Sequence, residues 1–546
     1  MRPTARLAAL ACASLTLSAC VSPGGVAQIV RDPAAKPAPV QIADGELVGA
    51  AAPRGKAWLG IPYAAPPVGP LRWRAPQPVA AWTGPRPSLR TGHDCTQNLS
   101  PRALQGRPGG WFVHGSEDCL VLNVYAPSNA VAGQGWPVMV WLHGGGFVAG
   151  TSANYDPSLL AQKQGVIVVT LNYRLGALGF LAHPALSAED PQAGSGDYAL
   201  LDQQAALRWV AANISAFGGD PHRVTLFGQS AGGFSVCHQM TAPGAARLFS
   251  GAIIESGACT SPDLNVSLAQ AETAGKRTAA DLGCADETHA VACLRALPAR
   301  RVMRAVSHRP GALGVNGWAP VVGGPVLPLS MPDAFASGRF AHMPVLMGTA
   351  HDEGRLFAVM QKAAGHLWSD RSYDAVVRQA YGGEGDAILA AYPAASDGGS
   401  AKAYASVITD QAFACPTTTL AGWLAPRVPT YLYAFDDPAP PYAFPNPPGF
   451  PSLGAYHASE IIYILQRPWI VADPGRFTPA QQALSDRMQA AWGAFARTGA
   501  PNGAGAPVWP RATPSSPVVL SLSPDAIHTE ADLGEHHCAL WARLGD

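Results

Sequence analysis

The chain has 546 residues, of which 48% are hydrophobic and 14% charged, and its 37 basic residues (Lys and Arg) balance its 37 acidic ones. This composition is typical of a globular protein, and the balanced charge gives no electrostatic basis for nucleic-acid binding. Glycine (58) and proline (51) are abundant. They predict many long loops, which are the segments that most often carry binding and catalytic groups.

The N-terminus has the pattern of an export signal. Arg2 and Arg6 precede a short apolar stretch, residues 7–17, which is too short to anchor the chain across a bilayer. The stretch ends in Leu-Ser-Ala-Cys at Cys20, which resembles the processing box of bacterial lipoproteins, where the cysteine is lipidated. The alternative is an ordinary signal peptide cut nearby, with Cys20 incidental. Either way we expect a protein exported to the bacterial cell envelope or secreted.

One domain is expected after the signal. We expect a signal peptide over residues 1–19, a Pro/Gly/Ala-rich tether over 20–40 and a single domain over 41–546. No later segment has the long uncharged apolar run of a membrane helix. A membrane contact is therefore expected only through the lipid, and the sequence leaves the oligomeric state open.

The cysteines indicate disulfides. Ten are present, and eight remain once Cys12 in the signal and Cys20 are set aside: Cys95, Cys119, Cys237, Cys259, Cys284, Cys293, Cys415 and Cys538. An even number in an exported chain predicts disulfides, but the pairing does not follow from the spacing. No spacing is typical of a zinc site, so no metal is expected.

Strand-like apolar runs alternate with helical patterns along the chain. The runs lie at residues 137–142, 166–171, 223–227, 252–254, 344–347 and 430–435, and two of the helical patterns lie at residues 200–212 and 485–497. This alternation predicts an α/β fold with a mostly parallel sheet covered by helices on both faces. Functional sites in such sheets form at the carboxyl ends of the strands.

Two glycine-rich motifs follow strand-like runs. Ser230 lies in Gly-Gln-Ser-Ala-Gly, residues 228–232, where a sharp strand-to-helix turn would expose its hydroxyl as a nucleophile. Alone this pentapeptide is a weak signal, because glycine and serine are common. His-Gly-Gly-Gly, residues 143–146, could be only a flexible turn. Together with the serine motif, however, it favours an oxyanion hole made of backbone N–H groups.

An acid and a base should follow the serine in chain order. Glu353 comes just after the run at 344–347, with Asp352 beside it as the rival acid, and spacing alone does not choose between them. Five histidines come later: His366, His457, His528, His536 and His537. His457 follows the run at 430–435 through a Pro-rich loop, so we expect it to be the base that takes the Ser230 proton.

Long stretches of the chain resemble the type-B carboxylesterase family, which includes the cholinesterases. Residues 217–232 are similar to that family's serine signature, and residues 117–125 to its second signature. Further similarity lies at residues 44–45, 60–64, 491–496 and 501–502. The resemblance runs from about residue 41 to the C-terminus and implies an α/β-hydrolase fold with large loop insertions.

The resemblance also implies roles for particular residues. The motif at residues 348–354 makes Glu353 the catalytic acid in preference to Asp352, and the motif at 455–460 makes His457 the base. The implied oxyanion donors are the N–H groups of Gly145, Gly146 and Ala231. The implied disulfides are Cys95–Cys119, Cys284–Cys293 and Cys415–Cys538. Pairing of Cys237 with Cys259 stays open.

Two positions depart from the family pattern. Gln229 stands where the family most often has Glu, which removes a charge beside the nucleophile without altering the triad. Trp111 lies near, but not at, the position of the aromatic residue that binds choline in cholinesterases, so the resemblance does not carry choline specificity.

The expected function is hydrolysis of a small-molecule carboxylic ester by Ser230, His457 and Glu353, through an acyl-enzyme and without a cofactor. One alternative is an amide, carbamate or lipid-ester hydrolase using the same triad. Alternatives of another class are a non-catalytic adhesion protein, as neuroligins are in this family, and a surface lipoprotein with a role in assembly. Because protonated imidazole cannot act as a base, activity should fall in acid, and the ordinary pKa of histidine is about 6.5.

Overall fold

The computed structural model describes most of the chain after residue 27. The described residues are 28–100, 102–103, 107–192, 194–257, 259–260, 266–309, 317–363, 369–395, 399–444, 452–466, 472–514, 517–531 and 536–545. Cys20, the expected signal peptide and His366 lie outside these ranges.

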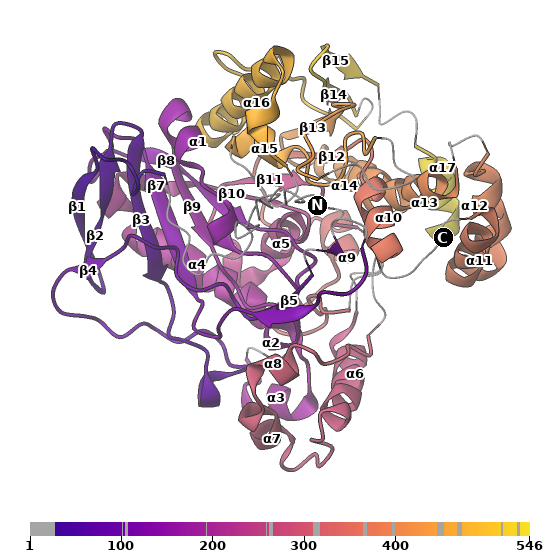
Figure 1. Cartoon of the computed structure of the whole chain (residues 1–546), viewed down its shortest axis with the longest axis horizontal. Coiled ribbons are helices and arrows are strands. Elements are labelled where there is room, and N and C mark those ends of the chain that lie inside the picture. Colours follow the sequence, from indigo (N-terminus) through magenta and orange to yellow (C-terminus); the bar gives the residue numbers. More distant parts are fainter. Residues whose placement is uncertain are drawn as a thin grey trace, which may run out of the picture.

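A large twisted sheet forms the centre of the molecule (Figure 1). Its strands are β1 (Lys36–Ile42), β2 (Gly45–Ala52), β3 (Gly55–Pro62), β4 (Arg86–Pro87), β7 (Val121–Ala126), β8 (Trp136–Leu142), β9 (Ile167–Leu171), β10 (Gly219–Gln229), β11 (Gly251–Glu255), β12 (Val345–Ala350), β13 (Thr430–Phe435), β14 (Val519–Leu522) and β15 (Ile527–Glu530). Their order is β1-β2-β3-β7-β9-β8-β10-β11-β12-β13-β14-β15, with β4 beside β2. A separate hairpin pairs β5 (Gln97–Leu99) with β6 (Phe112–His114).

Helices surround the sheet. Those before β12 are α1 (Ser158–Gln164), α2 (Gly176–Phe180), α3 (Pro184–Glu189), α4 (Tyr198–Asn213), α5 (Ala231–Thr241), α6 (Leu268–Asp281), α7 (Ala290–Ala296), α8 (Ala299–Val302) and α9 (Met331–Ala336). Those after it are α10 (Gly354–Ala363), α11 (Asp370–Tyr381), α12 (Gly385–Ala391), α13 (Ser400–Thr409), α14 (Cys415–Leu424), α15 (Ile461–Leu465), α16 (Pro479–Thr498) and α17 (Cys538–Gly545). A π-helical turn, Asp410–Ala414, joins α13 to α14.

The middle of the sheet is parallel and buried on both faces. Strands β9, β8, β10, β11, β12, β13 and β14 pair in parallel. Side chains that alternate along each strand enter two separate cores. In β8, Val138 and Val140 pack in the core that contains α4, α5 and α14. Met139 and Trp141 pack in the other core, with α1, α15 and α16. The predicted α/β fold with a mostly parallel sheet and helices on both faces is therefore confirmed.

The first strand begins earlier than the expected tether would allow. Strand β1 starts at Lys36, within residues 20–40, and pairs antiparallel with β2. It contains Pro37 and Pro39, which donate no backbone hydrogen bond, and it lies at the edge of the sheet. Proline is tolerated in an edge strand because one side of that strand needs no partner. This is why a proline-rich segment could be mistaken for a linker.

Four disulfides cross-link the described part of the chain. They are Cys95–Cys119, Cys237–Cys259, Cys284–Cys293 and Cys415–Cys538. Three are the pairs that the family resemblance implies, and the fourth joins the two cysteines whose pairing stayed open. Such a set fits an exported protein. In the described part of the chain, no helix is both long and apolar enough to span a membrane.

Candidate active site

Ser230 lies on the tight turn between β10 and α5. Its backbone has φ 57° and ψ −126°, a left-handed conformation that non-glycine residues rarely adopt. Its N–H donates to the Glu255 carbonyl of the neighbouring strand β11 (2.9 Å). The turn also requires its glycines, since a Cβ on Gly232 would lie 1.9 Å from the Leu142 carbonyl oxygen. The side chain is partly exposed, so a substrate can reach it.

His457 and Glu353 meet at the carboxyl ends of the adjoining strands. Nδ1 of His457 lies 2.5 Å from Oε2 of Glu353, and Glu353 Oε1 accepts a hydrogen bond from the Ala350 N–H (2.9 Å). Both side chains are buried. Nδ1 therefore carries the proton donated to the carboxylate, and Nε2 carries the lone pair. Nε2 lies 3.3 Å from the side-chain nitrogen of Gln229, the residue before Ser230.

Asp352, the rival acid, faces away from the imidazole. Its Oδ1 pairs with Arg355 (2.7 Å), and its Oδ2 accepts from the Ala455 N–H (3.0 Å). The Asp352 N–H donates in turn to the Ala455 carbonyl (2.9 Å). These contacts join the loop that carries Glu353 to the loop that carries His457. Asp352 thus holds the two loops together and does not contact the ring.

The other described histidines after Glu353 bind elsewhere. His536 Nδ1 lies 2.5 Å from Asp410 Oδ1, His528 pairs with Glu530 at 3.1 Å, and His537 packs on the Tyr392 ring. Among the five candidate bases, His457 is the one that the described residues place beside the serine turn.

The three glycines after β8 lie against the serine turn. A Cβ on Gly144 would lie 3.0 Å from the Ser230 Cβ, so the strand end and Ser230 are in close contact. Gly145 and Gly146 both have positive φ (119° and 60°). Neither N–H donates to another backbone group of the described chain. Ala231 is the first residue of α5, where an N–H has no helical acceptor. These are the three N–H groups expected to form the oxyanion hole.

His143 and Gln97 contact the glycine segment, residues 144–150, which follows β8. The buried His143 ring stacks on Tyr173 (4.3 Å between centroids), and its Nδ1 bonds the Gly144 carbonyl (2.9 Å). Burial lowers the pKa of His143 to about 4, so the ring is neutral near pH 7. Gln97, on β5, donates to the Gly150 carbonyl (3.0 Å) and accepts from the Gly150 N–H (2.9 Å).

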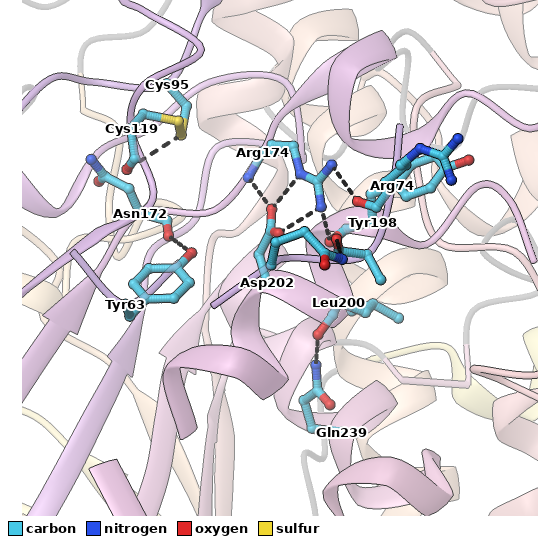
Figure 2. A network of polar contacts seen from close by, with 12 residues as sticks. Tyr63, Arg74, Cys95, Cys119, Asn172, Arg174, Tyr198, Leu200, Asp202 and Gln239 are labelled. Carbon is cyan, nitrogen blue, oxygen red and sulfur yellow. Dashed lines mark hydrogen bonds and ion pairs between the residues drawn. A yellow bond between two sulfur atoms is a disulfide. The ribbon is translucent and has the colours of Figure 1, made fainter. Parts of the chain in front are cut away.

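A polar network continues beneath this segment (Figure 2). Tyr63 donates to the Asn172 carbonyl (2.6 Å). The Asn172 side chain accepts from the Ser152 N–H (2.7 Å). Nearby, Arg174 forms a buried ion pair with Asp202 (2.7 Å), which joins the segment after β9 to α4. These buried contacts fix the strand ends on which the candidate site is built.

Two phenylalanines that the sequence did not single out line the imidazole. The ring centroids of Phe357 and Phe413 lie 4.9 and 5.0 Å from that of His457. Phe357 comes from α10 and is partly exposed, and Phe413 comes from the π-helical turn and is buried. No motif could have found them, because they reach His457 from separate segments. Trp111, in contrast, is 59% exposed in the connection of the β5–β6 hairpin.

Two further carboxyl groups are buried near Glu353 and His457. Burial raises the pKa of Glu255 to about 8, although the Trp492 side chain donates to it (2.7 Å), so Glu255 holds a proton near pH 7. Burial, and then the negative charge of Glu353, raise the pKa of Glu460 well above its ordinary value. Glu460 accepts from Ser256 Oγ at 3.5 Å. Burial thus favours the protonated form of both groups. Glu460 lies three residues after His457, the one sequence signal that could have identified it.

The comparisons with known proteins agree with this architecture. The model of the carboxylesterase family matches residues 36–541. A fumonisin B1 esterase of Sphingopyxis macrogoltabida is 39% identical over 466 residues, covering 83% of this chain and 81% of that protein. A human cocaine esterase is 34% identical over 484 residues, with the same two coverages. The solved structure of a PNB esterase superposes with a TM-score of 0.74 at 33% identity, covering 91% of this chain and 98% of that one. The chain therefore belongs to the carboxylesterase family and is a serine carboxylic-ester hydrolase.

Proposed function

We propose that Ser230, His457 and Glu353 form the catalytic triad and that hydrolysis proceeds through an acyl-enzyme. The observation that carries this proposal is the 2.5 Å contact between His457 Nδ1 and Glu353 Oε2. It leaves the Nε2 lone pair beside the residue that precedes Ser230. A base oriented by a buried carboxylate, close to a partly exposed serine, is the arrangement that activates a hydroxyl group.

Each group has a defined part in the reaction. His457 Nε2 takes the proton of the Ser230 hydroxyl as Oγ attacks the ester carbonyl. The N–H groups of Gly145, Gly146 and Ala231 stabilise the oxyanion that forms. His457 then returns the proton to the alcohol as it leaves. Water, deprotonated by the same imidazole, attacks the acyl-enzyme and releases the acid, while Glu353 stabilises the imidazolium in both halves.

The proposal is tested by comparing three variants of the protein that begins after Cys20, using p-nitrophenyl esters. Ser230→Ala should lose turnover, and Glu353→Gln should lower kcat by roughly 10²- to 10⁴-fold because the imidazole loses its oriented tautomer. Glu384→Gln, which alters an exposed carboxylate, is the control and should keep the activity. A folded Glu353→Gln as active as Glu384→Gln would refute the role of Glu353, and an active Ser230→Ala would refute the triad.

A series of p-nitrophenyl esters with acyl chains of increasing length separates the remaining alternatives. A peak at short chains identifies a carboxylesterase, and a peak at long chains a lipid-ester hydrolase. Turnover of matched amides would broaden the reaction beyond esters. Fumonisin B1, cocaine and acylcarnitines, the compounds in the names of relatives, belong in the substrate panel. A folded wild-type protein without turnover on any of them would favour the adhesion alternative.

We also propose that the mature protein is lipid-anchored through Cys20 in a bacterial envelope. The Leu-Ser-Ala-Cys sequence supports this proposal, although Cys20 lies outside the described residues. The described domain starts close behind it, since β1 begins at Lys36. A short tether would therefore keep the esterase near the membrane surface.

A further inference from the structure

Gln229 makes a direct contact with the proposed catalytic base. Its side chain is buried at the end of β10, and its Nε2 lies 3.3 Å from Nε2 of His457. On its other side the amide lies against the glycine segment, where a Cβ on Gly144 would be 3.0 Å from Gln229 Oε1. The amide thus sits between the base and the proposed oxyanion hole.

The direction of this hydrogen bond follows from the contact on the other ring nitrogen. In the neutral imidazole, the single ring proton lies on Nδ1 and bonds the Glu353 carboxylate, so Nε2 accepts. The Gln229 amide therefore donates an N–H to the Nε2 lone pair. That lone pair is the one that must receive the proton of Ser230. Among the described residues, no hydrogen bond joins Ser230 to His457, so Gln229 occupies the lone pair in the free enzyme.

The other carboxyl groups near the ring are buried. Glu353 is the carboxylate in contact with the imidazole. Burial raises the pKa of Glu255, on β11, to about 8 and that of Glu460, after His457, well above its ordinary value, which favours their uncharged forms.

The remaining neighbours are paired or uncharged. Asp352, in the loop after β12, is paired with Arg355 and His351. The rings of Phe357 and Phe413 cover the imidazole from α10 and the π-helical turn. Tyr433, on β13, is buried, and burial raises its pKa so that it stays neutral.

We propose that Gln229 is a positioning residue for His457, which holds the imidazole through Nε2 and so lets ester hydrolysis extend to lower pH than a glutamate at this position would. This inference rests on the proposed triad. In the amide orientation of the structure, a protonated Nε2 would direct its N–H at the N–H of Gln229, and Nε2 would gain an acceptor only if the amide turned its oxygen toward the ring. A carboxyl group at residue 229 would instead share a proton with Nε2, whichever of the two holds it. That proton would have to leave before His457 could act as a base.

The test is the pH dependence of kcat/KM, which reports ionisation in the free enzyme. Gln229→Glu should move the midpoint of the acid limb upward by roughly one to two pH units, the size of effect produced by a close carboxylate. Gln203→Glu is the matched control, because it also adds a buried carboxyl. Its neighbours Ser235 and Gln239 can both donate to that carboxyl, and its acid limb should coincide with that of the wild type.

Gln229→Met supplies a second measurement if Gln229→Glu does not fold, as judged by thermal unfolding. This variant keeps the volume of the side chain but has no N–H donor, so kcat should fall with little change in KM. The pH at the midpoint of the acid limb should rise by less than in Gln229→Glu. A folded Gln229→Glu whose acid limb coincides with that of the wild type would overturn the inference. Where only Gln229→Met folds, wild-type kinetics in that variant would do the same. Retained activity in Ser230→Ala would instead overturn the triad itself, so the two failures are distinguishable.

Discussion

Glu255 shows how burial controls the charge of a single residue. Its carboxyl group is fully buried at the end of β11 and accepts from Trp492 Nε1 (2.7 Å), and no cation contacts it among the described residues. Loss of hydration raises its pKa from the ordinary 4.5 to about 8. The folded protein therefore binds this proton more tightly than the unfolded chain does. Its contribution to stability is complete below about pH 4.5 and is lost as the pH rises through 8.

Replacing this carboxyl group should change how stability depends on pH. Glu255→Gln keeps an oxygen that accepts from Trp492 but cannot ionise, so the free energy of unfolding should fall less between pH 5 and pH 8.5 than in the wild type. Between pH 5 and pH 8.5, the stability of the variant relative to the wild type should therefore rise by about 4 kcal/mol. Urea unfolding at several pH values measures this, and the exposed Glu384→Gln serves as the control. Parallel curves for Glu255→Gln and the wild type would contradict the raised pKa.

The β5–β6 hairpin is the element that supports the glycine segment from outside the main sheet. Gln97 bonds both the N–H and the carbonyl of Gly150, as a neighbouring strand would. Asp94, just before the hairpin, accepts from Thr151 Oγ1 (2.6 Å) and lies 3.1 Å from His114 Nε2. The Cys95–Cys119 disulfide closes the loop that contains the hairpin. The position of Gly145 and Gly146 thus depends on an element outside the sheet that contains β8.

Removing the Gln97 contacts should loosen the proposed oxyanion hole. Gln97→Ala should lower kcat by roughly 10-fold, less than the loss of one oxyanion donor, and leave KM nearly unchanged, because the donors act mainly in the transition state. Steady-state kinetics on a short-chain ester measure both constants. Gln77→Ala, which removes an exposed glutamine bonded only to the Ala75 carbonyl, should behave as the wild type. An unchanged kcat in a folded Gln97→Ala would show that the hairpin does not position the donors.

At the scale of the whole molecule, the disulfides and the N-terminal sequence bear on the cellular compartment of the esterase. Cys415–Cys538 joins α14 to α17, and His536 bonds Asp410 beside it, so the C-terminal helix is fastened to the turn that carries Phe413. Cys237–Cys259 joins α5, the helix after Ser230, to the segment after β11. The chain is thus cross-linked on both sides of the candidate site, as suits an oxidising compartment.

The lipid anchor can be tested in cells of a bacterium fed an alkyne-bearing fatty acid. The full-length chain should become labelled and should partition into detergent, whereas Cys20→Ser should lose the label because the acylated thiol is gone. Cys12→Ser, altered within the expected signal peptide, is the matched control and should stay labelled. An unlabelled wild type, released in soluble form, would favour the ordinary signal peptide.

Local chemistry made several features predictable from the amino-acid sequence. The runs at 137–142 and 430–435 became β8 and β13 almost to the residue, because strands buried on both faces require continuous apolar side chains. The turn at Ser230 was predictable because its glycines allow a backbone approach that other residues cannot make. Family motifs named Glu353 and His457, and their catalytic roles stay predictions until the variants are measured.

Other features were decided only by the tertiary structure, because they depend on groups that meet across the fold. The pairing of Cys237 with Cys259 required α5 to lie beside the segment after β11. The contact of Gln229 with His457 joins residues 228 positions apart. Whether Glu255 is charged depends on how much water its neighbours exclude. A sequence records which side chains are present and how they recur along an element. Burial, proton positions and contacts between distant loops arise when the strands assemble out of chain order, as β9, β8 and β10 do here.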